Sequence, residues 1–292
     1  MKNGIRISMR LRHILEGYSF ISIWILGFIL FMAVPLGRSF YYSLNTLKPS
    51  KDGLIATYEG LKHYRAAFTT DVNFLPLLQK TVTTMLTQVP LILIFAMFSA
   101  LLLNRHSIGR IVFRGIFFLP VIIASGAVLR KLLQQGAAQL PIFYQYDLYG
   151  KLRTFIPGEI LEPLLMYADS LTLVMWDAGV QILIFLAGLQ TISPQLYEAA
   201  KCDGATKWES FWKITFPMIM PMIFVNTLYS IVNSFTKVDN QVMDHILNVV
   251  FRTNDYGYGS AIGWIYFFIV FIILGIVFLI FRKGLAATEG RV

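Results

Sequence analysis

Residues 260–281 read SAIGWIYFFIVFIILGIVFLIF, which is 22 consecutive positions without a charged side chain. The hydrocarbon core of a bilayer is about 30 Å thick, and a helix of about 20 apolar residues crosses it. A stretch this long and this apolar therefore predicts a membrane-spanning helix. The same test, applied along the whole chain, decides the fold.

Five further stretches pass this test. They lie at about residues 18–37, 81–104, 111–133, 171–189 and 218–236. Basic residues precede the first stretch, as in a signal peptide, but the apolar run is too long and no small-residue cleavage site follows it, so we expect an uncleaved span. The sequence predicts an all-α polytopic membrane protein with six transmembrane helices in a single transmembrane domain, residues 1–292.

The composition excludes a water-soluble enzyme. Hydrophobic residues make up 56% of the chain and charged residues only 14%, whereas soluble domains carry roughly a quarter charged residues. One cysteine, Cys202, and four dispersed histidines provide neither a disulfide nor a metal cage. No nucleophile elbow or closely spaced pair of carboxylates is visible, so we expect no catalytic residue and no cofactor or metal bound by this chain.

The net charge of +9 follows from membrane topology. Segments on the side of the two termini hold thirteen basic and five acidic residues, and the remaining twelve basic and eleven acidic residues lie on the other side. Basic residues gather on the cytoplasmic side of membrane proteins. We therefore expect both termini in the cytoplasm, and no nucleic-acid partner.

The loop at residues 191–217, between the fourth and fifth spans, predicts a helix, a turn and a second helix on the cytoplasmic side. Ser193 is a typical N-cap residue, and Pro194 suits the first helical position. Gly204 can adopt the left-handed conformation that ends a helix. Thr206 followed by Glu209 forms a capping box that starts the next helix.

The first of these two helices is short and carries small side chains on one face. Leu196, Ala199, Ala200 and Asp203 follow helical spacing, so this face permits close approach of a neighbour. A helix of this length is marginal in water and must be held by packing. Spacing alone leaves two interpretations open, an ordinary intramolecular loop and a surface for a partner.

The same loop resembles the EAA loop of ABC importer permeases. The resemblance rests on Glu198-Ala199-Ala200, Gly204, Ile214 and Phe216-Pro217, where the family usually has Leu-Pro. Further motifs are similar to those of the carbohydrate-importing branch, the maltose and glycerol-phosphate type: Leu186-Ala187-Gly188-Leu189-Gln190, Asp203-Gly204-Ala205, Gly60-Leu61 with Tyr64, Leu101-Leu102-Leu103-Asn104, and Tyr256-Gly257-Tyr258-Gly259-Ser260-Ala261.

The resemblance implies that the first short helix is a coupling helix, which sits in a cleft of a cytoplasmic ATPase. Its coupling residues are Glu198, Ala199, Ala200, Asp203 and Gly204. This chain lacks a P-loop, so ATP and magnesium belong to the partner ATPase, which is present in two copies. The resemblance also implies a second permease subunit, usually a different chain, an extracytoplasmic solute-binding protein, and a bacterial or archaeal cell membrane.

Polar residues inside the predicted spans have two possible uses. They hydrogen-bond one helix to another, or they line a solute path. The candidates for the substrate pathway are Asp177, Gln181, Asn226, Tyr229, Asn233 and Trp264. For Asp177 the structural alternative is an ion pair with Arg130, Lys131 or Lys237.

The leading functional hypothesis is uptake of an oligosaccharide or glycan fragment by alternating access. The segment Val238–Met243 departs from the Thr-x-Gly-Gly-Pro type of stretch that the branch often carries there, so the sequence does not identify the sugar. One alternative is an importer permease for a glycerol-phosphate compound or a peptide. Others are a self-powered secondary transporter and, from another class, a membrane enzyme or assembly factor.

Overall fold

The computed structural model describes residues 9–50, 53–104, 115, 174–175, 177–237 and 239–289. Apart from Gly115, the predicted third span at 111–133 lies outside these residues. The chain divides into two compact units. Unit 1 consists of residues 1–75 and 245–267, and unit 2 consists of residues 76–244 and 268–292.

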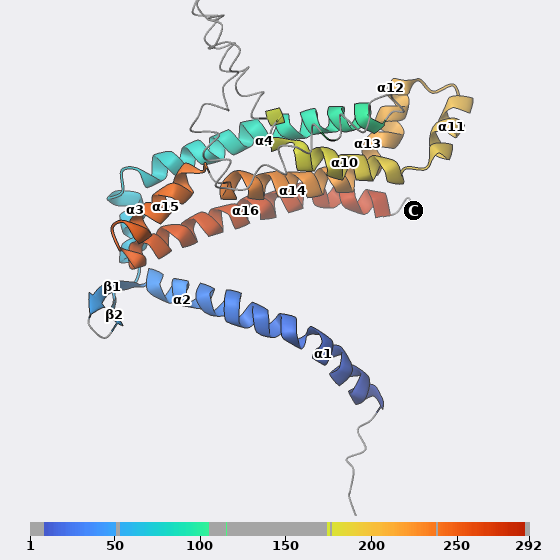
Figure 1. Cartoon of the computed structure of the whole chain (residues 1–292). Coiled ribbons are helices and arrows are strands. Elements are labelled where there is room, and N and C mark those ends of the chain that lie inside the picture. Colours follow the sequence, from blue (N-terminus) through green and yellow to red (C-terminus); the bar gives the residue numbers. More distant parts are fainter. Residues whose placement is uncertain are drawn as a thin grey trace, which may run out of the picture. The chain divides into compact units, whose positions relative to one another are not determined.

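Helices dominate the described residues (Figure 1). Three stretches are long and apolar enough to cross a membrane, and they contain the predicted first, second and sixth spans: Glu16–Ser43, Phe74–Asn104 and Tyr256–Arg282. They are formed by α1 (Met9–Phe28), η1 (Ile29–Ala33) and α2 (Val34–Ser43), by α4 (Phe74–Asn104), and by α16 (Tyr256–Glu289). Each helix extends beyond its predicted span, because helical hydrogen bonding continues into polar turns that apolarity does not detect.

Two further apolar stretches are bent pairs of helices. In the first pair α10 (Gly179–Thr191) meets α11 (Pro194–Cys202) at 63°. In the second pair the residues Lys207–Met218 meet α14 (Met220–Thr236), also at 63°. The first leg of the second pair comprises α12 (Lys207–Ser210), η2 (Phe211–Thr215) and α13 (Phe216–Met218). α10 and α14 overlap the predicted fourth and fifth spans, but with 13 and 17 residues each helix alone is shorter than a span.

Both π-helical segments lie just before a proline. η1 ends two residues before Pro35, and η2 ends two residues before Pro217. Proline has no N–H to donate, and its ring clashes with the carbonyl four residues earlier in a regular helix. In both segments the following residue donates its N–H to the carbonyl five residues earlier. The wider π turn thus accommodates the proline. The helix continues to Ser43 after Pro35, whereas after Pro217 it ends at Met218, before the bend into α14.

The expectation of an all-α protein was wrong at one place in unit 1. β1 (Asn45–Ser50) and β2 (Gly53–Tyr58) form a two-stranded antiparallel hairpin, in which Asn45 pairs with Tyr58 and Ser50 with Gly53. The sequence carries a signal for it, because Asp52-Gly53 is a dipeptide typical of hairpin turns. Apolar length gives no signal for these strands, which are too short and too polar to cross a membrane.

Two glycines in unit 1 are required by close packing at the start of α16. A β-carbon at Gly257 would collide with the carbonyl oxygen of Asn45 and the ring of His63, and one at Gly259 would collide with Val250. Replacing Gly257 would therefore push apart segments that lie far apart in sequence, and replacing Gly259 would displace the nearby Val250.

The core of unit 2 is formed mainly by α4, α10 and the residues around α11 and α14. Small side chains on α4 let the helices approach, and aliphatic and aromatic side chains of α10 fill the space between them. The fully or nearly fully buried members are Ile92, Ala96, Ala100, Leu103, Val174, Ala178, Ile182, Phe185, Leu186, Leu189, Ile192 and Ile219. We call this set the core cluster.

Asp71 joins three segments of unit 1. Its Oδ2 accepts hydrogen bonds from the hydroxyl of Tyr258 (2.6 Å) and from Nε2 of His245 in α15 (Gln241–Phe251) (2.8 Å). Its Oδ1 accepts from the backbone N–H groups of Asn73 (2.8 Å) and Phe74 (3.0 Å) at the start of α4. Partial burial acts to raise the pKa of Asp71, but these hydrogen bonds outweigh it and lower the pKa from 3.8 to about 2.

Replacement of Asp71 by Asn should destabilise unit 1. The lowered pKa corresponds to roughly 2 kcal/mol of stabilisation of the carboxylate, which is present above pH 4 and is lost as the pH falls towards 2. We expect the wild-type protein in detergent to lose thermal stability over this pH range, and Asp71→Asn to lack both the stability at pH 7 and this pH dependence.

Tryptophan fluorescence during heating measures the effect. Asp244→Asn is the matched control, because it makes the same charge change at an exposed carboxylate beside His245. Equal losses in the two variants would contradict the role assigned to Asp71.

Candidate functional site

The segment 191–217, which resembles the EAA loop, begins with α11. The helix starts at Pro194, after the extended backbone of Ser193 (φ −61°, ψ 129°), so the predicted start is confirmed. The expected capping hydrogen bond of Ser193 is absent. Proline sets this helix start instead, because its fixed φ suits the first helical position and its missing N–H is not needed there.

The predicted end of α11 at Gly204 is also confirmed. Gly204 has φ +79°, which a residue without a β-carbon adopts freely. Its N–H donates to the carbonyl of Lys201 (3.1 Å), and the N–H of Ala205 donates to the carbonyl of Ala200 (2.9 Å). These two bonds form a Schellman motif, which satisfies the last carbonyls of the helix and fixes the direction of the chain after it.

The predicted capping box starts α12. Oγ1 of Thr206 accepts from the N–H of Glu209 (3.2 Å), and Oε2 of Glu209 accepts from the N–H of Thr206 (2.9 Å). The backbone N–H of Thr206, its hydroxyl and nearby Lys213 lower the pKa of Glu209. The turn between the two helices is therefore held at both ends by hydrogen bonds within the segment.

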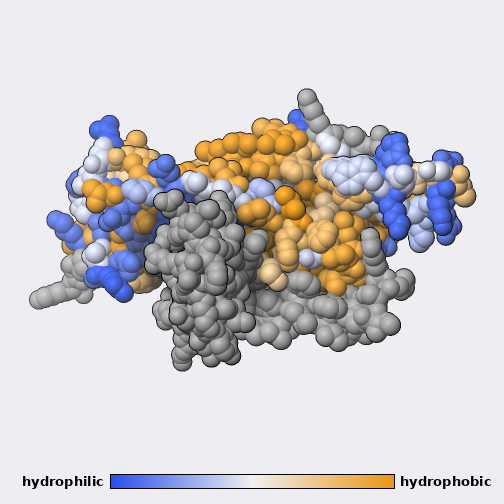
Figure 2. Space-filling view, turned by 90° about the horizontal axis from the view of Figure 1, so that it is seen from above, coloured by the Kyte–Doolittle hydropathy of each residue, from blue (hydrophilic) through white to orange (hydrophobic). Residues whose placement is uncertain are grey.

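α11 lies on the surface of unit 2 and has no buried residue. Of the five predicted coupling residues, Ala200 is half-buried. The other four are exposed: Glu198, Ala199, Asp203 and Gly204. The end of unit 2 that holds α11 and α12 carries hydrophilic residues, whereas the neighbouring helices are hydrophobic (Figure 2).

One side chain connects α11 to the rest of the unit. The hydroxyl of Tyr197 lies 2.8 Å from Oγ1 of Thr215 in η2, and the ring packs against the core cluster. Sequence reasoning missed this pair, because the two residues lie 18 positions apart and neither belongs to a motif. The bond holds a helix that would be marginal alone.

Two of the predicted pathway residues form a buried polar contact between α10 and α14. Nε2 of Gln181 donates to Oγ of Ser230 (2.9 Å), and Nδ2 of Asn226 donates to the backbone carbonyl of Gln181 (3.2 Å). Both side chains are fully buried, and within the described residues their amide oxygens have no hydrogen-bond partner. This geometry is that of hydrogen bonding between helices, the structural alternative for polar residues in spans.

Asp177 lies beside Lys237 at the end of α14. Nζ of Lys237 is 3.6 Å from Oδ2 of Asp177 and 3.6 Å from Oδ2 of Asp239. Lys237 is one of the three partners considered for Asp177, and the other two, Arg130 and Lys131, lie outside the described residues. The cluster has two carboxylates for one ammonium group, and its side chains are partly exposed.

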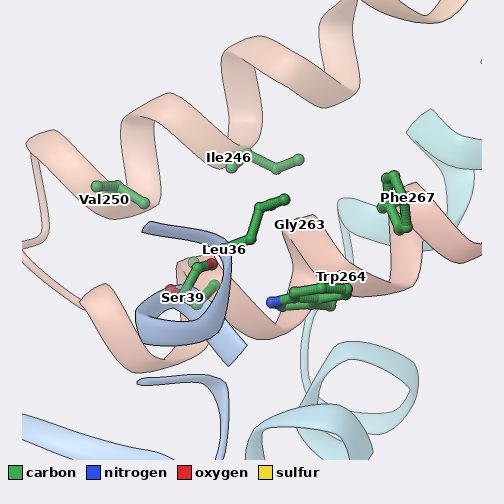
Figure 3. A pocket seen from close by; sticks show the side chains of 9 residues that line it. Leu36, Ser39, Ile246, Val250, Gly263, Trp264 and Phe267 are labelled. Carbon is green, nitrogen blue, oxygen red and sulfur yellow. The ribbon is translucent and has the colours of Figure 1, made fainter. Parts of the chain in front are cut away.

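The other three predicted pathway residues are more exposed than Gln181 and Asn226. On α14, Tyr229 is exposed and Asn233 is half-buried. Trp264 belongs to unit 1, where it lines a hollow of about 250 Å³ together with Leu36 and Ser39 of α2 and residues of α15 and α16 (Figure 3). The site residues predicted from sequence therefore belong to two different units.

The Asp71 cluster of unit 1 was not anticipated from the sequence. His245 lies 174 positions from Asp71 and Tyr258 lies 187 positions from it, so no local spacing could connect them. Only the tendency of a lone aspartate before an apolar helix to cap it could have drawn attention to Asp71.

Comparison with known proteins supports the resemblance. Residues 74–288 match the family described as "Binding-protein-dependent transport system inner membrane component". The probable ABC transporter permease protein YesP of Bacillus subtilis (strain 168) is 32% identical over 293 residues, covering 92% of this chain and 90% of that protein. The arabinooligosaccharides transport system permease protein AraP of Halalkalibacterium halodurans is 27% identical, covering 88% and 84%.

Solved structures show the same fold. Two are bacterial ABC transporter structures, one described as involved in the import of the acidic polysaccharide alginate and one as the alginate transporter in complex with an alginate pentasaccharide-bound periplasmic protein. The chains matched in them superpose with TM-scores of 0.62 and 0.63 at 18% identity, and the matches cover 94% and 96% of this chain and 97% and 98% of those chains. The family match spans most of the sequence, and the chain therefore belongs to the binding-protein-dependent transport system inner membrane components.

Proposed function

We propose that this chain is a permease subunit of an ATP-driven ABC importer that takes up an oligosaccharide or glycan fragment. Family membership supports the transport role. The names of relatives support the solute class, since they include a multiple sugar-binding transport system permease and two arabinooligosaccharide permeases. The observation that carries the proposal is α11, an exposed nine-residue helix whose two ends are fixed by the chain around it.

The exposed face of α11 suits a protein partner. Small residues such as Ala199 and Gly204 let a second surface approach the backbone, and Glu198 offers a charge for a basic group. We assign this face to the ATPase subunits, two copies of which bind ATP and magnesium. Through the bond between Tyr197 and Thr215, a displacement of α11 reaches η2 and, along the chain, α14.

In the proposed transport cycle the solute path opens alternately to the two sides of the membrane. An extracytoplasmic binding protein delivers the solute, and a second permease subunit, of a different sequence, supplies the other half of the path. Both termini and α11 lie in the cytoplasm of a bacterial or archaeal cell. The polar residues Asp177, Tyr229 and Asn233 contribute to the path, and Gln181 and Asn226 hold its walls together.

Isolation of the intact transporter tests this function. The chain is extracted from its native membrane in mild detergent, and stoichiometric partners are identified by mass spectrometry. We expect two copies of a P-loop ATPase and one further multi-span protein. A stable chain without any ATPase would overturn the proposal and favour a self-powered transporter.

Changes on α11 should disrupt the proposed contact with the ATPase. Glu198→Lys reverses the charge on the docking face. Gly204→Val forces a β-branched residue to φ +79°, which costs about 1–2 kcal/mol and disturbs the Schellman turn. Both variants should insert in the membrane but lose solute uptake and ATPase co-purification.

The control for these variants is Gln195→Lys, which adds a positive charge to the exposed surface of the same helix one turn earlier. Uptake measured with radiolabelled oligosaccharides separates the variants. Wild-type uptake by both Glu198→Lys and Gly204→Val would show that α11 is not the coupling helix.

Removal of the charge on Asp177 should change transport without affecting the ATPase. In Asp177→Asn the ammonium group of Lys237 keeps Asp239 as its partner, so no charge is left unpaired while the path loses a carboxylate. We expect altered uptake or solute preference at unchanged ATPase stoichiometry. Asp239→Asn is the matched control, since this carboxylate is more exposed (41% against 24%). Loss of the ATPase from Asp177→Asn would assign Asp177 a structural role.

A further inference from the structure

Four aromatic rings form a continuous patch between α11 and α14. We call it the aromatic face, and it consists of Trp208, Phe211, Trp212 and Phe216. Trp212 is at its centre, with ring centroids 5.6 Å from Trp208, 5.0 Å from Phe211 and 5.1 Å from Phe216. Trp208 is 69% exposed and Trp212 is 46% exposed. Large aromatic side chains at such exposure mark a surface that contacts a partner or a membrane.

The opposite side of the same segment is held by the protein. Ile214 packs against the core cluster, and Thr215 is buried beside the hydroxyl of Tyr197. The segment therefore cannot rotate to bury its aromatic rings. Because Tyr197 belongs to α11, the aromatic face and the helix proposed for coupling are fixed to each other.

The direction of the segment relates it to the membrane. The residues Lys207–Met218 are bent by 63° from the 17-residue helix α14, and only the two together are long and apolar enough for a span. With α14 taken along the bilayer normal, a segment bent by 63° lies closer to the membrane plane than to the normal. Amphipathic helices in this position place aromatic side chains at the level of the lipid headgroups.

The charges beside the aromatic face complement a bilayer. Lys207 begins the segment, Lys213 lies near its middle, and both are exposed, as contact with anionic headgroups requires. Glu209, the one acidic residue among them, is engaged in the capping box. Tryptophan is enriched at membrane interfaces because its ring is apolar and its N–H is polar.

We propose that the aromatic face lies in the headgroup layer of the bilayer and sets the depth at which α11 is presented. The occupant of this surface is lipid, with anionic headgroups at Lys207 and Lys213. The second part, the effect on α11, rests on the proposed function, whereas the lipid contact does not. The competing occupant is a protein partner such as the ATPase, and the experiment distinguishes the two.

Spin labels measure the depth of the segment directly. Cys202 is the only cysteine in the chain, so a Cys202→Ser background allows single labels through Trp208→Cys, Trp212→Cys and, as the control on the polar side, Glu209→Cys. The assembled transporter is reconstituted in vesicles of phosphatidylethanolamine and phosphatidylglycerol. Collision with oxygen, which concentrates in lipid, is compared with collision with a water-soluble nickel chelate.

We expect labels at 208 and 212 to favour oxygen over the chelate, with a ratio typical of the headgroup region, and the label at 209 to favour the chelate. Labels at 208 and 212 that are as accessible to the chelate as the label at 209 would place the face in water and overturn the proposal. Labels shielded from both agents would mean that a protein covers the face, and would overturn it as well. None of these readouts requires transport. A failure of the proposed lipid contact can therefore be distinguished from a failure of the proposed importer function.

A second pair of variants tests whether the rings act together. With the label at 208, Trp212→Ala should shift the collision ratio towards that of water, because Trp212 contacts the other three rings. Trp212→Tyr, which keeps an amphipathic ring, should retain the lipid-like ratio. An equal shift in both variants would show that the segment has unfolded locally and that the aromatic rings do not define its depth.

Discussion

The absence of water in a bilayer is the constraint on which this structure depends. Each backbone N–H and carbonyl within the hydrocarbon must find its partner inside the chain, and a helix meets this requirement locally. The long apolar helices α4 and α16 follow directly from this constraint. It also explains why the chain accommodates Pro35 by widening the helix into a π turn, since an interrupted helix in lipid would leave further polar groups unsatisfied.

Polar side chains within these helices meet the same requirement by pairing. Gln181 and Ser230 connect α10 to α14, and Asn226 reaches the backbone of α10 from α14. Lys237 lies between two carboxylates where α14 ends. These contacts give the two helices a defined alignment that apolar packing in lipid would not supply, because lipid chains are as apolar as the helix surfaces.

The segment from α11 to α14 connects a surface helix to a candidate membrane span through specific contacts. The Schellman motif at Gly204 and the capping box at Thr206 fix the turn, and the bond between Tyr197 and Thr215 ties the two halves together. A short helix with no buried residue keeps its position only because of such connections. The same connections allow a displacement at α11 to be felt at the start of α14, which is the mechanical requirement for coupling two distant sites.

The sequence alone determined three spans, which lie within Glu16–Ser43, Phe74–Asn104 and Tyr256–Arg282. It also determined the bounds of α11, its closing glycine and the capping box of α12, because each depends on residues within a few positions of one another. It did not predict the hairpin of β1 and β2, although Asp52-Gly53 is typical of a turn, because these six-residue strands lack the apolar length that identifies a span. Only the tertiary structure decided which polar groups meet: Asp71 with His245 and Tyr258, Gln181 with Ser230, and Tyr197 with Thr215. It also decided which face of residues 207–216 stays exposed. These outcomes depend on the packing of segments far apart in the chain, and residue periodicity within one segment carries no information about its distant neighbour.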